Sequence, residues 1–79
     1  MPKTRTVIDN AVAEYTRRQT RQTVKRLLHR AERLNGDRLA KVQNAGRELR
    51  QVLDSLHAID ASSARRFALT IGWGDRFPA

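Results

Sequence analysis

The sequence contains no cysteine and only two prolines and four aromatic residues among its 79 residues. Without cysteine, no disulfide can brace the fold, and the zinc sites that depend on thiolates are excluded. A chain of this length has room for one domain with a small core. We therefore expect a single small domain over residues 1–79, and the lack of cysteine fits the reducing cytoplasm.

Long apolar runs are also missing from the sequence. No stretch approaches the ~20 consecutive apolar residues that a membrane-spanning helix needs. The first residues, Met1-Pro2-Lys3-Thr4-Arg5, lack the apolar segment of a secretory signal peptide. We expect a soluble protein with no membrane partner.

Helical periodicity is what the sequence does contain, on both sides of Asn35-Gly36-Asp37. Gly36 suits the left-handed residue that ends a helix, and Asp37 suits the N-cap of the next one. The pattern predicts an antiparallel helical hairpin over residues 24–59 that pivots at residues 35–37. Apolar residues recur at steps of three and four before the pivot at Val24, Leu27, Leu28, Ala31 and Leu34, and after it at Leu39, Val42, Gly46, Leu49, Leu53 and Leu56.

A helical segment is also predicted from Val7 to Tyr15. It is followed by Thr16–Thr23, a stretch without apolar residues and without proline or glycine. At 100° per residue, the apolar stripe of residues 7–15 lies about 150° around the axis from that of residues 24–34. Either the helix breaks or bends at residues 16–23, or its N-terminal end packs on another neighbour. We favour the change of neighbour.

A lone hairpin of this size is marginally stable, so the core needs another element or a second subunit. Ala64, Phe67, Ala68 and Ile71 share a helical face, while residues 67, 69, 71 and 73 alternate as in a strand. We favour a short third helix, because a lone strand would have no partner, with an irregular aromatic tail at residues 72–79. The expected fold is all-α, with a dimeric four-helix bundle as one way to complete the core.

Catalytic and ligand-binding groups are scarce. His29 and His57 are the only histidines, and a hairpin that pivots at residues 35–37 would hold them far apart. Ser62 and Ser63 fit helix caps, and the Gly-x-Gly at residues 72–74 is too short for a phosphate-binding loop. The sequence therefore predicts a protein that is not an enzyme and has no metal, cofactor or small-molecule substrate.

Positive charge is concentrated at one end of the chain. Residues 1–36 carry nine Lys and Arg against three acids, a net +6, whereas residues 37–60 carry four of each and are neutral. The seven residues that stand out spread over the helical arc opposite Leu27, Ala31 and Leu34, with Glu32 as the only acid among them. They are Arg17, Arg18, Arg21, Lys25, Arg26, Arg30 and Arg33.

Such a basic stretch points to a polyanionic partner. Like charges four residues apart weaken an isolated helix, so a purely structural helix would usually intersperse acids here. Arginine side chains suit phosphate geometry, and Gln19, Gln22 and Thr23 lie among them. Since no helix-turn-helix spacing is present, we expect sequence-tolerant binding of nucleic-acid phosphates in a regulatory or accessory role, by a homodimer. The alternative interpretation is that the charged face is simply solvated and binds no partner.

An acidic protein surface is the competing partner. Very small helical proteins, including those carried by phages and plasmids, often act as inhibitors or adaptors of larger assemblies. In this interpretation the same basic residues meet an acidic host protein. Trp73 and Phe77 either anchor in a pocket of that partner or fold back to cover the open end of the hairpin, which is the structural alternative that we favour.

Overall fold

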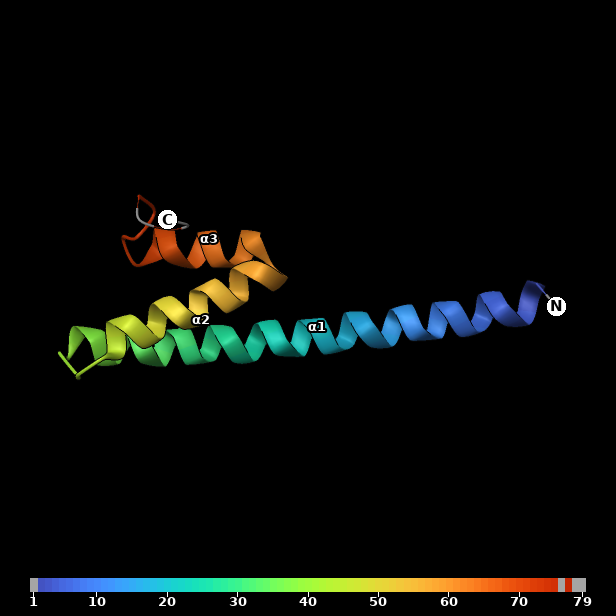
Figure 1. Ribbon diagram of the computed structural model, residues 1–79, viewed down its shortest axis with the longest axis horizontal. Helices are drawn as coiled ribbons and strands as arrows, with labels where there is room; N and C mark the ends of the chain where they lie inside the picture. Colours follow the sequence, from blue (N-terminus) through green and yellow to red (C-terminus); the bar gives the residue numbers. More distant parts are fainter. Residues whose placement is uncertain (1, 76, 78–79) are drawn as a thin grey trace.

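The computed structural model describes the backbone of residues 2–75 and 77 and the side chains of residues 13–75 and 77. Three helices make up this part of the chain: α1 (Pro2–Leu39), α2 (Ala45–Ile59) and α3 (Ala61–Thr70) (Figure 1). The all-α prediction and the short third helix are confirmed, and the strand alternative at residues 67–73 is wrong. The molecule measures 59 × 22 × 16 Å because α1 alone is 38 residues long.

The core lies between α2 and the C-terminal part of α1. Leu49, Leu53 and Leu56 of α2 are fully buried, and they face the stripe of α1 that includes Ala31 and Leu34. α2 runs antiparallel to α1, and α3 folds back across α2 (Figure 1). The predicted helical hairpin is therefore present, and α3 is the additional element that a bare hairpin lacks.

The predicted pivot at Asn35-Gly36-Asp37 is wrong. All three residues lie inside α1, and the link between α1 and α2 occupies residues 40–44. Two residues expected in the core stripe of the second helix are instead exposed near the turn, with 68% of Leu39 and 52% of Val42 accessible. α1 is also continuous through residues 16–23, so the alternative of a break in that stretch is wrong too.

The position of the turn follows from matching the two apolar stripes. In an antiparallel pair, residues at equal distances from the turn lie opposite each other. A turn centred near residue 42 brings Leu53 opposite Ala31 and Leu56 opposite Leu28. A turn at Gly36 would have placed the two leucines opposite the polar stretch at residues 16–19. Burial of those leucines outweighs the cost of about 1 kcal/mol for a glycine within a helix.

Two backbone hydrogen bonds close the C-terminal end of α1. The amide of Lys41 donates to the carbonyl of Arg38 at 3.0 Å, and the amide of Val42 donates to the carbonyl of Asp37 at 2.9 Å. This is a Schellman motif, in which the residue after the cap is left-handed. Lys41 takes that conformation with φ of 61°, and Asn44 takes it with φ of 66° just before α2.

The same motif ends α3, here with the glycine that it favours. Gly72 has a φ of 80°. Its amide donates to the carbonyl of Leu69 at 3.1 Å, and the amide of Trp73 donates to the carbonyl of Ala68 at 2.7 Å. Gly72 is also the first residue of the irregular tail expected at residues 72–79. At the other end of α3, Asp60 is the N-cap: its Oδ2 accepts from the Ser63 hydroxyl at 2.7 Å and its Oδ1 from the Ser63 amide at 3.1 Å. These two bonds, the hydroxyl bond foremost, lower the pKa of Asp60.

None of the helices in the described residues has the length and apolar character required to cross a bilayer. This agrees with the low hydropathy of the two longer helices, α1 being polar around most of its circumference and α2 apolar on one side only.

The backbone conformations of Gly36, inside α1, and Gly72, at the end of α3, can be tested with one substitution each. Gly36→Ala should raise the free energy of unfolding by about 0.5–1 kcal/mol, since a Cβ at this helical position meets no atom within 4 Å. Gly72→Ala should lower it by about 1 kcal/mol, because alanine is strained at a positive φ. Urea denaturation followed by circular dichroism measures both. Destabilisation by Gly36→Ala would show that the chain turns at Gly36 after all.

Candidate nucleic-acid interface

The N-terminal part of α1 projects beyond the rest of the molecule. Figure 1 shows α2 and α3 beside the C-terminal part of α1 only, with the blue end of the helix extending away from them. Every side chain from residue 13 to residue 22 is exposed, and partial burial begins at Thr23 and Val24. We call residues 13–22 the arm. The apolar stripe predicted at residues 7–15 lies mostly outside the described side chains; Tyr15, at its end, is exposed.

The seven basic residues singled out in the sequence are all exposed on α1. They do not share one narrow face. Arg17 and Arg21 precede Val24 and Leu28 by seven residues, or two turns, so they point to the side of α1 that α2 and α3 cover farther along. Arg26, Arg30 and Arg33 lie on the opposite, solvent side. Positive charge therefore surrounds the helix where the arm leaves the core.

Few of these charges are neutralised within the molecule. Arg18 has the one ion pair among the seven in the described part of the chain, a 3.4 Å contact with Glu14 in which both side chains are largely exposed. Such a pair contributes little. The Arg17 Nε donates to the Ala13 carbonyl at 3.4 Å. The other five have no hydrogen-bond or ion-pair partner among the described residues: Arg21, Lys25, Arg26, Arg30 and Arg33.

The polar residues of the arm differ in what they have to offer a ligand. The hydroxyls of Thr20 and Thr23 donate to the carbonyls of Thr16 and Gln19, each at 2.9 Å, so the helix itself satisfies them. Gln19 and Gln22 are exposed. The two glutamines are thus better placed than Thr23 to contact a ligand.

The two tail aromatics lie against the core. Phe77 is 4% exposed, its ring stands edge-on to that of His57 with centroids 5.5 Å apart, and the Arg50 guanidinium lies 5.1 Å from its centroid. Trp73 is partly buried, with the Arg38 guanidinium 5.1 Å from its ring. Phe77 would have to leave the core to anchor in a partner. No local pattern in the sequence indicated these long-range contacts with Arg38, Arg50 and His57.

The two histidines do not form a binding site with acids. Both lie at similar distances from the turn at residues 40–44, so the expectation that a hairpin would hold them far apart rested on the wrong pivot. His29 is exposed on α1, whereas the Nε2 of His57 is buried with no hydrogen-bond partner among the described atoms. Within the residues that the structure describes, no cluster of three metal-ligating side chains is present.

Comparison of the chain with protein-family models, with curated proteins and with solved structures gives no match. The interpretation of the basic surface therefore depends on its own geometry and charge.

The role of Phe77 can be separated from that of a docking anchor. Phe77→Ala should lower the free energy of unfolding by about 3 kcal/mol, because it empties a buried site. Leu69→Ala, at a position that is 68% exposed, should change it by less than about 0.5 kcal/mol. Urea denaturation measures both. Unchanged stability in Phe77→Ala would favour a tail that is free to bind a partner.

Proposed function

We propose that this protein is a non-enzymatic binding protein that holds nucleic-acid phosphates with the basic residues of α1, in a regulatory or accessory role. The observation that carries the proposal is the run of exposed basic side chains from Arg17 to Arg33, most of them without a partner in the described molecule. This run covers roughly 24 Å of helix at 1.5 Å per residue. It is long enough to meet several successive phosphates.

The exposure of the arm supports a mode in which the helix lies in a groove. An α-helix is about 10–12 Å across with its side chains, and the major groove of B-DNA is about 12 Å wide. Because basic residues leave α1 on both sides, they would reach phosphates on both walls of the groove. Gln19 and Gln22 would then face base edges, although a pair of glutamines gives little sequence discrimination.

Self-association through the arm belongs to the proposal. Helices in proteins owe most of their stability to tertiary packing. Residues 13–22, however, are exposed and have no neighbour from the described residues of α2 or α3. A second copy packed on the Tyr15 face of the arm, which lies about 160° around the helix axis from Arg17, would supply one and would double the number of phosphate contacts. The lack of cysteine supports function in a reducing compartment such as the cytoplasm.

Salt dependence tests the phosphate-binding role. Replacing Arg17 and Arg21 with Gln should reduce the slope of log affinity against log salt by about 2 for a random-sequence duplex, since each lost phosphate contact accounts for about 0.9. The matched control replaces exposed Arg47 of α2 and Arg65 of α3 with Gln, which changes net charge equally away from the arm. Fluorescence anisotropy measures the slopes, with a single strand in parallel.

Two results would contradict this assignment. If the wild-type protein binds neither the duplex nor the single strand at low salt, α1 is not a nucleic-acid surface, and an acidic protein partner takes its place. If the control pair lowers the slope as much as the arm pair, the effect comes from net charge alone. Circular dichroism of each variant confirms that the helices are intact.

Sedimentation tests the dimer. The wild-type protein should sediment at twice its mass of 9.0 kDa at micromolar concentration, and Tyr15→Glu should dissociate it, because a carboxylate would replace an exposed aromatic side chain of the arm. Gln51→Glu adds the same charge at an exposed position of α2, away from the arm, and serves as the control. A compact monomer of the wild-type chain would contradict self-association.

A further inference from the structure

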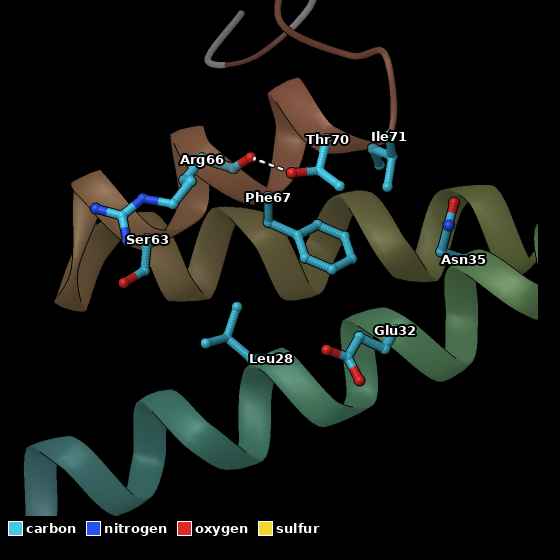
Figure 2. A pocket seen from close by; sticks show the side chains of 8 residues that line it. All are labelled: Leu28, Glu32, Asn35, Ser63, Arg66, Phe67, Thr70 and Ile71. Carbon is cyan, nitrogen blue, oxygen red and sulfur yellow. Dashed lines mark hydrogen bonds between the residues drawn. The ribbon is translucent and has the colours of Figure 1, made fainter.

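An open groove runs between α1 and α3. α2 packs against both helices, and the space that separates α1 from α3 on one side of α2 is a hollow of about 420 Å³. α3 approaches α2 closely through the fully buried Ala64 and Ala68, which leaves Phe67 to point across the hollow toward Leu28 (Figure 2). Eight residues line it: Leu28, Glu32 and Asn35 from α1, Ser63, Arg66, Phe67 and Thr70 from α3, and Ile71 directly after α3.

The groove has apolar walls and a polar rim. Leu28, Phe67 and Ile71 are each only partly buried by the rest of the chain. Glu32 and Arg66 stand exposed on opposite walls, and no ion pair joins them. The α3 wall extends from residue 63 to residue 71, about 12 Å at the rise of an α-helix. Grooves of this kind accept one face of an amphipathic helix, whose apolar residues recur at steps of three and four.

The α1 wall of the groove continues directly into basic residues. A second hollow of about 180 Å³ adjoins the first at Leu28 and Glu32 and is bordered by Lys25 and His29. One turn farther toward the N-terminus come Arg21 and then Arg17, on the same side of α1 as Leu28. A helix seated against Leu28 and Phe67 would therefore pass along three cations over roughly 17 Å beyond the apolar walls.

We propose that this groove binds an acidic amphipathic α-helix of a partner protein. The apolar face of that helix would enter between Leu28, Phe67 and Ile71, and its acidic extension would lie along Lys25, Arg21 and Arg17. Four cations on this path, Lys25, Arg21, Arg17 and Arg66, outnumber the two acids beside them, Glu32 and Glu14, so charge complementarity favours an acidic occupant. This site overlaps the phosphate contacts proposed above at Arg17, Arg21 and Lys25, whereas its apolar walls at Leu28, Phe67 and Ile71 take no part in those contacts.

A second copy of the chain fits the groove less well. The apolar face of α2 is buried in its own core, and so are the small residues of α3. The remaining helix, α1, belongs to the N-terminal half of net charge +6, so laying it along the groove of another copy would bring arginines opposite arginines. Like charges at such a distance disfavour the pairing.

A synthetic peptide tests the proposal on the full-length protein. The probe is a fluorescein-labelled helix of about 20 residues with leucines spaced by three and four at its centre and glutamates toward both ends. Thr70→Glu places a carboxylate in the groove at an exposed lining position, and Ser62→Glu makes the same change on α3 outside it. We expect Thr70→Glu to weaken peptide binding at least about tenfold and Ser62→Glu to leave it unchanged.

A charge-inverted peptide, with lysines in place of the glutamates, should bind at least about tenfold more weakly than the acidic one. Thr70→Glu should leave duplex affinity and the sedimentation mass unchanged, so that failure of this proposal can be told from failure of the phosphate-binding role. Equal effects of the two α3 substitutions, or equal binding of the two peptides, would overturn the proposal. Conversion of a wild-type dimer to a monomer by Thr70→Glu would assign the groove to a second copy instead.

Discussion

Burial of one short apolar stripe of α1 against α2 is the interaction on which the rest of the structure depends. α2 has 15 residues and α1 has 38, so at 1.5 Å per residue a helix of about 23 Å covers part of one of about 57 Å. The uncovered length includes the arm, with its exposed arginines. The narrow stripe also leaves α3 to pack on α2, through Ala64 and Ala68, and thereby opens the groove beside Leu28.

The sequence predicted the kinds of elements better than their ends. The three-and-four spacing at Leu49, Leu53 and Leu56 reports burial on one side of a helix, and those residues are buried. Asn35-Gly36-Asp37 has the composition of a turn, but a local preference of about 1 kcal/mol is small beside the burial of two leucines. Lys41 carries no comparable signal, although it adopts the left-handed conformation that closes α1. Matching the leucines of α2 to the stripe of α1 would have located the turn.

The sequence likewise predicted part of the candidate site, while the rest depends on the three-dimensional structure. Charge counting finds Arg17 to Arg33 because an excess of arginine is a property of composition. The direction of each side chain needs the phase of a continuous helix, and that phase puts Arg17 and Arg21 on the side of Leu28. The groove is a property of three helices together: Leu28 and Phe67 are far apart in sequence, and each has the pattern of an ordinary core residue. Without the packing of α3 on α2, neither could be assigned to an open surface.

The two proposed ligands would share Arg17, Arg21 and Lys25 of α1 but would differ in their other contacts. An acidic helix in the groove would cover Arg17, Arg21 and Lys25, while Arg26, Arg30 and Arg33 would remain on the solvent side. The electrostatic part of the binding free energy rises roughly with the number of phosphate contacts. Such a helix would therefore weaken nucleic-acid binding by removing the contacts of the cations it covers, without abolishing the binding. The partner would thus act as a graded competitor, and its effect would diminish as salt screens both interactions. A purely apolar occupant of the groove would leave the phosphate contacts unaffected, so the acidity of the partner is what would link the two surfaces.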